Sequence, residues 1–479
     1  MNKITSTYLH SLQSIYNRIS LRGIRMDLQR LEAARLFVDL DIERNLDIAS
    51  KHWGCLIYAG ADKDKAKVPN SCNINSTQGE KSFLNKLIDL GYNVPKITKK
   101  NDEGDYEQKE STAELVLQKI LAANQFNTAG GDPGIRAILR VRELGKIRSS
   151  YINARLLERE GGSYYLSGYN VAGTVTGRRS SKQHIFGFGN NAQNLPTRGD
   201  LAKIYKSCLV SRLGNIFLFV DQIQAEEWPV SALSMNEEAL HDLRTGVDRH
   251  SKLASVIFEC HVPPKGGPGW DKKIHDIQRY MGKKTKHARN YGMKAPRMSD
   301  SLAQEGYSIS KALCEQMLKK AHLADPSVED VFQFNIRAKL SQDRILSTPF
   351  GRERLFLELR PNADNSSAFN EGYSYIPQSV VGDDTGFALF QLESDYDERE
   401  RAIIQEGHDS LVQDIPAKED SIWTYLQRTI KAFDRPIRFS NGIEINIPIE
   451  AEIGYNFEQR EKIEDMSFDG VREAWRRLK

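Results

Sequence analysis

Cysteine is scarce in this 479-residue sequence, and the few cysteines lie far apart along the chain. The five cysteines include no C-x-x-C pair, which argues against a zinc ribbon and against a scaffold held together by disulfides. Because disulfides persist mainly in oxidising compartments, this usage fits a reducing one, and we expect a cytoplasmic protein. The cysteines are Cys55, Cys72, Cys208, Cys260 and Cys314.

Long apolar runs are also missing. No stretch approaches the roughly 20 apolar residues that a membrane-spanning helix needs. The first residues, MNKITSTYLHSLQ, lack the apolar core of a secretory signal. We therefore expect no signal peptide and no association with a membrane. Internal repeats and low-complexity tracts are absent as well, which argues against a solenoid.

A strong net charge is the third feature that the sequence lacks. Its 67 Lys and Arg nearly balance its 64 Asp and Glu, so the total of +3 identifies no partner. The distribution is more informative, because residues 279–297 carry seven Lys or Arg and no acid, whereas residues 393–420 are rich in acids. A basic surface near an acidic patch suits a polyanion that is bound together with metal ions.

The length predicts several domains or one domain with lobes. Helical periodicity marks residues 5–46, with a break at 21–27, and residues 135–157. The basic residues of the second helix allow two interpretations, a solvated surface or a grip on duplex phosphates. We also expect a helix capped by Ser76 within residues 73–90, and a solvated loop at 98–108.

The remaining residues predict a sheet that is interrupted by a helical insert. Strand patterns begin near residue 163, helical patterns fill residues 236–341, and strands return near 345. PPKGGPGW at 263–270 marks a sharp boundary inside the insert. Alternation across residues 443–455 predicts a final strand pair. One sheet would thus be built from two distant parts of the chain, which makes the fold α+β.

A short apolar run, IFLFV at residues 216–220, is followed at once by Asp221. Five residues are too few for an ordinary helix, and aromatic and branched residues suit a buried strand. Asp221 then lies at the exposed end of the strand, where a sheet would hold a metal-binding carboxylate rigidly. The alternative is that Asp221 only begins a turn or caps the next helix.

A second aspartate lies far along the chain. Residues 401–416, RAIIQEGHDSLVQDIP, predict a hairpin with Asp409 near its tip. Aspartates on neighbouring strands can hold two divalent cations about 3.5–4 Å apart. That arrangement serves in-line phosphoryl transfer.

Inside the helical insert, residues 279–293 read RYMGKKTKHARNYGM. Arg279, Lys283, His287 and Tyr291 recur every four residues, which places them on one helix face. The two cations come nearer the positive end of the helix, where a triphosphate binds well, and the two rings could stack on a base. The alternative is a basic surface helix with incidental aromatic residues.

Together these three segments resemble the motifs of family A DNA polymerases, the bacterial polymerase I type. VDQIQAEEW resembles motif A, GHDSLVQDIP resembles motif C, and the basic helix fits the motif B pattern R-x3-K-x7-YG. Further similar segments lie at 142–152, 174–181, 191–198, 246–255, 348–355 and 376–383. The motif residues are Asp221, Gln224, Glu226, Arg279, Lys283, Tyr291, Gly292, His408 and Asp409.

The resemblance implies a right-hand fold of thumb, palm and fingers. The helical thumb would span residues 1–165, with the palm beginning after about 160. The antiparallel palm sheet would take residues 166–235 and 341–479, the latter ending in the C-terminal strands and helix. The helical fingers would span residues 236–340.

The resemblance also implies roles for single residues. Asp221 and Asp409 would bind two Mg²⁺ ions, which Mn²⁺ can replace, with the backbone carbonyl of Gln222 as a further ligand. Lys283 would join the two aspartates as a catalytic residue, and Glu226 would exclude a 2′-hydroxyl. The nucleotide-binding residues would be Arg279, Lys283, His287, Tyr291, His250, Glu226 and Gln224. The DNA-binding residues would be Arg178, Asn191, Gln193, Asn194, Arg198, Gln378, His408 and Arg352.

The implied reaction is template-directed addition of dNTPs to the 3′ end of a primer, by a monomer whose partners are primer-template DNA and dNTPs. Three departures from the family bear on it. Ser410 stands where Glu is usual, so two aspartates must suffice for the metal ions. Gln222 replaces a common Tyr, and His287 replaces the Phe or Tyr that stacks on the incoming base.

The thumb-like region begins almost at Met1, which leaves no room for a 3′–5′ exonuclease, so we predict no proofreading by this chain. A separate exonuclease, a helicase or a processivity factor are candidate partners. A phage-like motif B suggests viral replication in the cytoplasm of a host cell. The alternatives are a single-subunit RNA polymerase, which Glu226 argues against, a non-catalytic DNA-binding subunit, and a repair or lesion-bypass polymerase.

Overall fold

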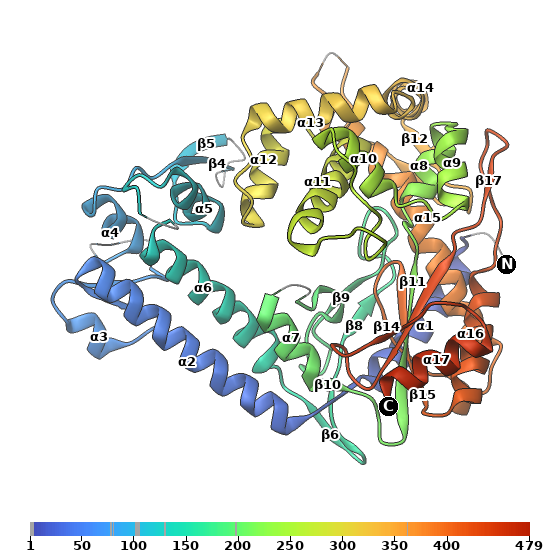
Figure 1. The fold of residues 1–479 in the computed structure, drawn as a ribbon, viewed down its shortest axis with the longest axis horizontal. Helices are drawn as coiled ribbons and strands as arrows, with labels where there is room; N and C mark the ends of the chain where they lie inside the picture. Colours follow the sequence, from blue (N-terminus) through green and yellow to red (C-terminus); the bar gives the residue numbers. More distant parts are fainter. Residues whose placement is uncertain are drawn as a thin grey trace. The chain divides into compact units, whose positions relative to one another are not determined.

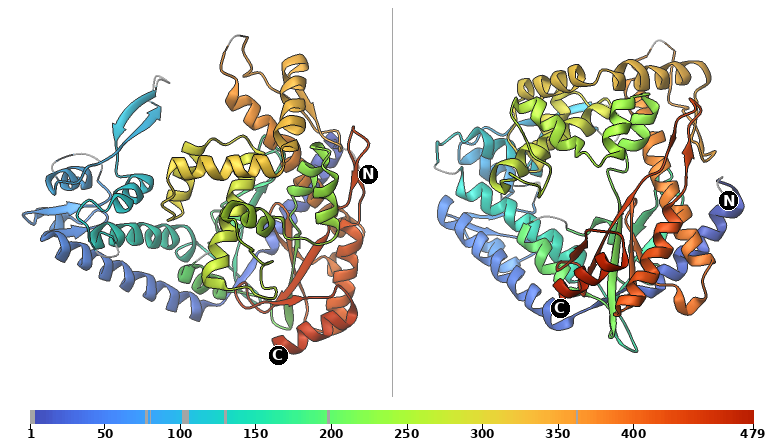
Figure 2. Two further views of the ribbon diagram at one scale, coloured as in Figure 1. Left: turned by 45° about the horizontal axis from the view of Figure 1, so that its top comes forward. Right: turned by 45° about the vertical axis from the view of Figure 1, so that its right-hand side comes forward.

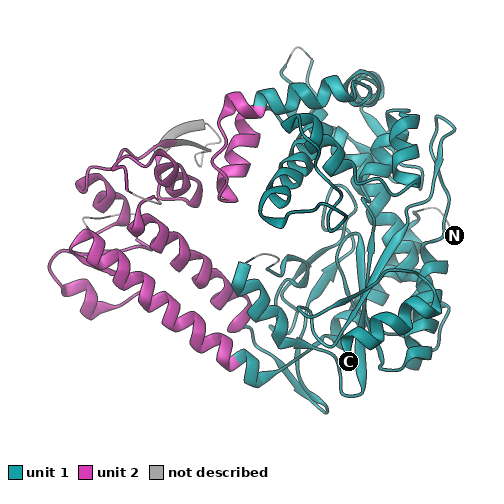
Figure 3. Ribbon diagram, in the orientation of Figure 1, with its two compact units in different colours: residues 1–31, 154–294, 315–479 teal, residues 32–153, 295–314 magenta. Residues whose placement is uncertain are grey.

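The computed structural model describes residues 4–76, 79, 81–100, 106–128, 131–196, 199–361 and 363–479. The chain divides into two compact units (Figure 3). Unit 1 contains residues 1–31, 154–294 and 315–479, and unit 2 contains residues 32–153 and 295–314. Within the described residues, no helix combines the length and the apolar composition that crossing a bilayer requires.

A five-stranded antiparallel sheet organises unit 1, in the order β14-β15-β11-β18-β19. Figure 1 labels β11, β14 and β15 of this sheet. Its central strand β11 confirms the strand predicted around residues 216–220. Strands β14 and β15 form the predicted hairpin, and β15 pairs with β11, although 180 residues lie between the end of β11 and the start of the hairpin. The strands are β11 (Asn215–Gln222), β14 (Ile403–Glu406), β15 (Ser410–Pro416), β18 (Ile449–Gly454) and β19 (Glu461–Ile463).

Side chains from one face of this sheet form the main core of unit 1. Ile216, Leu218 and Val220 alternate along β11 and are buried in one core with side chains of helices α1 (Ser6–Arg22), α15 (Ser366–Ser394) and α16 (Glu419–Phe433). Figure 2 shows the ribbon of this unit from two further directions. Burying a side chain of this size stabilises a fold by about 1.5–3 kcal/mol. The packed face therefore anchors β11 and fixes the position of Asp221 at its end.

Helix α15 corrects the expectation that mainly strands follow residue 341. It is 29 residues long and contains Pro377, and most of its side chains are buried. Because the helix is surrounded by protein, it has no polar face, and the amphipathic pattern that reveals a surface helix is missing. Short strands β12 (Ile345–Ser347) and β13 (Glu353–Leu355) precede it and confirm the strand expected near residue 345.

The helical insert is confirmed over residues 236–341. Helix α10 packs closely against α11, since a Cβ on Gly282 of α11 would clash with the carbonyl oxygen of His250 on α10. This close approach brings residues of both helices to one surface. Helix α8 (Glu227–Leu233) precedes the insert. The α-helices of the insert are α9 (Glu237–Arg244), α10 (Arg249–Phe258), α11 (Lys272–Asn290), α12 (Ala295–Gln304), α13 (Lys311–Ala324) and α14 (Phe334–Asp343).

Two strands are confirmed within residues 443–455, but they do not pair with each other as a final strand pair would. Strand β17 (Glu444–Ile445) pairs with β16 (Ile437–Arg438), whereas β18 joins the main sheet between β11 and β19. Other elements of unit 1 are β1 (Ile24–Met26), β6 (Leu157–Arg159), β7 (Gly162–Tyr165), β8 (Gly168–Asn170), β9 (Ser180–Lys182), α7 (Gly199–Cys208), β10 (Leu209–Val210) and α17 (Phe468–Leu478).

Unit 2 is mainly helical, and its secondary structure differs from the sequence prediction in three places. Ser82, not Ser76, caps α4, because its side chain accepts a hydrogen bond from the N–H of Asn85. Strands stand at both ends of the stretch that was expected to be a loop. Helix α6 ends at Ile147 and continues as a short π-helix only to Ile152. The elements are α2 (Leu28–Trp53), β2 (Leu56–Tyr58), α3 (Lys63–Lys67), β3 (Ser71–Asn73), α4 (Phe83–Asp89), β4 (Lys96–Lys100), β5 (Tyr106–Glu110), α5 (Glu114–Ala123) and α6 (Pro133–Ile147).

Candidate active site

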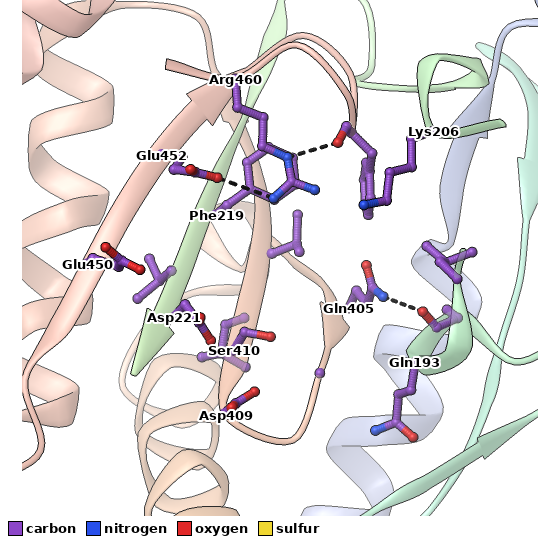
Figure 4. A pocket seen from close by; sticks show the side chains of 17 residues that line it. Gln193, Lys206, Phe219, Asp221, Gln405, Asp409, Ser410, Glu450, Glu452 and Arg460 are labelled. Carbon is purple, nitrogen blue, oxygen red and sulfur yellow. Dashed lines mark hydrogen bonds and ion pairs between the residues drawn. The ribbon is translucent and has the colours of Figure 1, made fainter. Parts of the chain in front are cut away.

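Asp221 and Asp409 meet at one end of the main sheet. The register of β11 and β15 sets Asp221 opposite Ser410, and Asp409 directly precedes Ser410. The backbone N–H of Gln222 donates a 3.0 Å hydrogen bond to the carbonyl oxygen of Asp409. Figure 4 shows the side chains of Asp221, Ser410 and Asp409 lying together at this end. The structure thus brings together the two aspartates that the sequence proposed as metal ligands.

The turn that carries Asp409 is held by a buried carboxylate. Glu406 accepts a 3.0 Å hydrogen bond from the N–H of His408 and a 2.9 Å bond from the side-chain amide of Gln193. His408 has a φ of +75°, a left-handed conformation that is uncommon outside glycine. These contacts fix a strained turn and therefore the position of Asp409.

Negative charge is concentrated around the two aspartates. Desolvation by the surrounding protein and the neighbouring carboxylates of Asp409, Glu450 and Glu452 raise the pKa of Asp221, although its side chain faces the cavity. Desolvation also raises the pKa of Asp409, while Arg178 opposes the shift. Carboxylates that repel each other in this way suit a hard divalent cation, which would neutralise them.

The ligand set also fits magnesium. Within the described part of the chain, no group of three or more His, Cys, Asp or Glu side chains is arranged to hold a metal. Mg²⁺ commonly binds through one or two carboxylates and completes its coordination with water and substrate phosphates. Asp221 and Asp409 are enough for such a site. The side chain of Gln222 bonds the buried Asp384 instead, at 2.7 Å, so only its backbone carbonyl could serve as a ligand.

A cavity of about 420 Å³ lies on the sheet face beside these carboxylates (Figure 4). Phe219 is two residues before Asp221 on β11 and therefore shares its face. Arg460 stacks on the Phe219 ring at 3.8 Å and pairs with Glu452 at 3.3 Å. Burial and the nearby Arg460 lower the pKa of Lys206, which also lines the cavity. Carboxylates and cations thus face each other across this space.

A larger cavity of about 840 Å³ is lined by both aspartates and by residues of helix α11. It is called the nucleotide cavity after the ligand that the sequence predicts for these residues. It contains every residue predicted for metal and nucleotide binding except Tyr291. The lining includes Asp221, Gln222, Gln224, Glu226, His250, Arg279, Lys283, His287 and Asp409. Tyr291 follows the last residue of α11, where its hydroxyl donates to the Glu226 carboxylate and its ring lies 4.8 Å from that of His287, edge to face.

Contacts within the protein already position several of these side chains. Asp248 caps α10 and also accepts hydrogen bonds of 2.6 and 3.3 Å from Arg279. Burial lowers the pKa of the neighbouring His250 to about 4, so its imidazole is neutral at pH 7. Gln224 donates a 3.2 Å bond to the carbonyl oxygen of Val247. These contacts hold the side chains of Arg279 and Gln224 in place at the cavity wall.

The residues predicted to bind DNA are dispersed around the cavities. Arg178 forms an ion pair with Glu226, and Arg352 pairs with the buried Asp383 at 2.7 and 2.8 Å. Asn191 caps the short helix that holds Gln193 and Asn194, Gln378 is half-buried on α15, and His408 lies in the Asp409 turn. Arg198 lies outside the described residues. Their contact with DNA stays a prediction.

Sequence reasoning missed a buried ion pair at the wall of the nucleotide cavity, which Glu227 lines. Lys286 on α11 contacts Glu227 of α8 at 2.5 Å, and both side chains are buried. Asn290 adds a 3.2 Å hydrogen bond to Glu227. The sequence predicted phosphate-binding roles only for Arg279 and Lys283 of this helix and none for Lys286. Helical spacing provides no signal, because Lys286 lies three residues after Lys283 and seven after Arg279, positions that share a helix face.

Desolvation opposes ionisation of both partners of this pair. For Glu227 the opposite charges of Lys286 and Arg249 outweigh burial and lower the pKa to about 2. Burial lowers the pKa of Lys286 to about 8, although Glu227 counteracts it. Both groups are therefore charged at pH 7. Glu450 and Glu452 were also missed, although the alternation across residues 443–455 put both on one strand face.

Comparison with known proteins gives a consistent result. Residues 57–459 match the family model for DNA polymerase family A. The chain is 24% identical over 447 residues to the thermostable DNA polymerase I of Thermus aquaticus, covering 92% of this chain and 46% of that protein. It is 21% identical over 337 residues to the DNA polymerase of Bacillus phage SP01, covering 65% of this chain and 34% of that protein. The chain thus spans about half or less of the length of these relatives.

A solved structure confirms the predicted right-hand α+β fold. The POL domain of Pol1 from M. smegmatis, in complex with DNA primer-template and dNTP, superposes with a TM-score of 0.71 at 19% identity. The alignment covers 94% of this chain and 70% of that chain. Because the family model matches more than half of the sequence, this chain belongs to DNA polymerase family A.

Proposed function

We propose that this protein is a DNA-directed DNA polymerase that adds dNTPs to the 3′ end of a primer. The observation that carries the proposal is the shared cavity of Asp221, Asp409 and the cationic face of α11. Carboxylates at one side can hold metal ions, and cations at the other can hold a triphosphate. The division of the chain into thumb, palm and fingers at the expected boundaries belongs to the same proposal.

The proposed roles follow from the chemistry of each side chain. Two Mg²⁺ ions, which Mn²⁺ can replace, would be held by Asp221, Asp409 and the carbonyl of Gln222, and when bound would lower the pKa of the primer hydroxyl and neutralise phosphate charge. Lys283 supplies a positive charge to the phosphates, and Arg279 can bind two phosphate oxygens at once. The neutral imidazole of His250 can donate one hydrogen bond to the same group.

Primer extension tests the proposal directly. A labelled primer annealed to a longer template is incubated with the protein, four dNTPs and Mg²⁺. We expect template-directed extension, loss of extension with EDTA, and recovery on adding Mg²⁺ or Mn²⁺. Protein that binds the duplex but extends no primer with either metal ion would overturn the proposal and favour the non-catalytic alternative.

Sugar selection should depend on Glu226. Its carboxylate lines the nucleotide cavity and is fixed by Tyr291 and Arg178. A fixed group in this position would meet the additional hydroxyl of a ribonucleotide and reject it. We expect Glu226→Ala to lower the ratio of dNTP to rNTP incorporation by roughly 10–100-fold, measured by single-nucleotide kcat/KM. Glu226→Gln, which keeps the size, should retain most selectivity, and equal ratios in all three proteins would exclude this role.

Base stacking is the role proposed for His287. The ring is half-exposed in the nucleotide cavity and its edge-to-face contact with Tyr291 holds it there. Because stacking of a base on a ring contributes about 1–3 kcal/mol, His287→Ala should raise the KM for dNTPs at least about fivefold. His287→Phe should restore it. An unchanged KM in the alanine variant would show that His287 does not stack.

The biological setting is proposed from two indications. A motif B of phage type and the similarity to the DNA polymerase of Bacillus phage SP01 favour viral DNA replication in the cytoplasm of a host. The absence of proofreading, the monomeric state and the accessory partners stay predictions. Incubating the protein with a mismatched primer and Mg²⁺ in the absence of dNTPs tests the first, since shortening of the primer would reveal an exonuclease.

A further inference from the structure

A loop between α10 and α11 reaches the nucleotide cavity. Pro264, Lys265 and Gly266 line this cavity together with Arg279 and Lys283. The sequence marked the loop, PPKGGPGW at residues 263–270, only as a boundary within the helical insert. The resemblance to the polymerase family assigned no role to it, so the position of Lys265 requires its own explanation.

The loop is anchored at both ends. The side chain of Val262 is buried, and its N–H donates a 2.9 Å hydrogen bond to the hydroxyl of Ser255 on α10. At the other end, the rings of Trp270 and His275 lie 5.5 Å apart, and Asp271 caps α11. Because both ends of the loop are held by these contacts, the position of its tip relative to α10 and α11 is restricted.

A tight turn places Lys265 at the tip. The N–H of Gly267 donates a 2.9 Å hydrogen bond to the carbonyl oxygen of Pro264, which closes a four-residue turn. Gly266, the third residue of the turn, has a φ of +75°, which is the conformation that type II turns require of glycine at this position. Lys265 therefore occupies the second position, where its side chain projects away from the turn.

Lys265 is charged and exposed, and within the described residues it makes no hydrogen bond or ion pair. Arg279, in contrast, is already engaged by Asp248. An unpaired ammonium that lines a cavity with Arg279, Lys283 and Lys462 suits a polyanion, because lysine binds phosphate as a flexible point charge. A nucleoside triphosphate has the charge that this surface would bind.

We propose that Lys265 is a phosphate-binding residue of the nucleotide site, which contacts the triphosphate of the incoming dNTP alongside Arg279, Lys283 and His250. The inference rests on the proposed polymerase function and extends it by one residue. The contact would form as the nucleotide enters and would add to binding without taking part in the chemical step.

The test compares Lys265→Ala with the wild type in two assays. In primer extension we expect the KM for dNTPs to rise roughly three- to tenfold with kcat nearly unchanged, as for one exposed charge contact. In the second assay, a dideoxy-terminated primer-template binds the next dNTP without reaction, and its Kd should rise by the same factor. Lys265→Arg should restore both values, and the Kd for primer-template alone should stay constant.

The matched control is Lys273→Ala, an exposed lysine at the start of α11 that does not line the cavity. It should leave the nucleotide Kd unchanged. A nucleotide Kd in Lys265→Ala equal to that of the wild type would overturn the inference, as would an effect confined to DNA affinity or one reproduced by Lys273→Ala. Wild-type protein that neither extends the primer nor binds the dNTP would overturn the polymerase proposal together with this inference.

Discussion

Replacing Asp221 or Asp409 with Asn is expected to lower single-turnover primer extension by at least about a thousandfold, which corresponds to about 4 kcal/mol of transition-state stabilisation. The substitution preserves shape but removes the charge on which metal binding depends. Affinity for primer-template should change less than about threefold in a gel-shift titration, since removing a negative charge does not weaken binding to a polyanion.

The stability of the metal-free protein provides a second readout. The pKa of Asp221 is raised in the folded chain, so its contribution to stability is greatest at low pH and is lost as pH rises through the folded pKa. The Asn variants should therefore melt at an equal or slightly higher temperature than the wild type at pH 7 with EDTA. Because the Asp221 side chain is exposed to solvent, we expect the change in melting temperature to be small.

Ser410→Ala is the matched control for the aspartate substitutions. Ser410 lies opposite Asp221 in the register and next to Asp409, but it carries no charge. Extension by this variant should remain within about threefold of the wild type. Extension by Asp221→Asn or Asp409→Asn within tenfold of the wild type would contradict a two-metal mechanism at this site.

The second large effect is expected at Lys286. Substitution by Met leaves the buried Glu227 carboxylate without its cation, and breaking a buried pair in this way costs about 3–5 kcal/mol. The loss should appear as a lower midpoint of thermal unfolding. Because Glu227 begins α8 directly after Glu226, and Lys286 precedes His287, loosening this contact should also raise the KM for dNTPs.

The double variant Glu227→Leu with Lys286→Met tests whether the loss of stability in Lys286→Met comes from leaving the Glu227 charge buried without a partner. Apolar side chains of similar volume often replace a buried ion pair without loss of stability. The double variant should therefore recover most of the lost stability. Lys273→Met, at an exposed position of the same helix, should change stability by less than about 0.5 kcal/mol. If Lys286→Met were no less stable than Lys273→Met, the ion pair would have no stabilising role.

Local patterns allowed the sequence to predict the core of the site. The run IFLFV followed by Asp221 predicted β11, and the apolar segments around Asp409 predicted the hairpin. Both are short-range signals, in which strand-forming residues stop at a turn. That these segments are neighbours was a prediction from chemistry and from family resemblance, since pairing over such a distance leaves no periodicity in the sequence.

Features that depend on tertiary surroundings could not be predicted in the same way. Helix α15 is buried on most sides, so its sequence has no polar face that would indicate a helix. Lys286 is chemically the same as the cations around it, and only the packing of α11 on α8 shows that it points into the protein. The position of Lys265 at the cavity depends on the contacts that hold both ends of its loop, and these contacts cannot be read from the local sequence.

The bond between Asp248 and Arg279 has a consequence for turnover. Asp248 already binds Arg279, so in the proposed polymerase a triphosphate would gain only the difference between its own attraction for Arg279 and that of Asp248. Nucleotide binding would then be weaker than the number of cations suggests, and a poorly matched nucleotide would leave quickly. After the proposed reaction, Asp248 would compete for Arg279 again and so favour release of pyrophosphate.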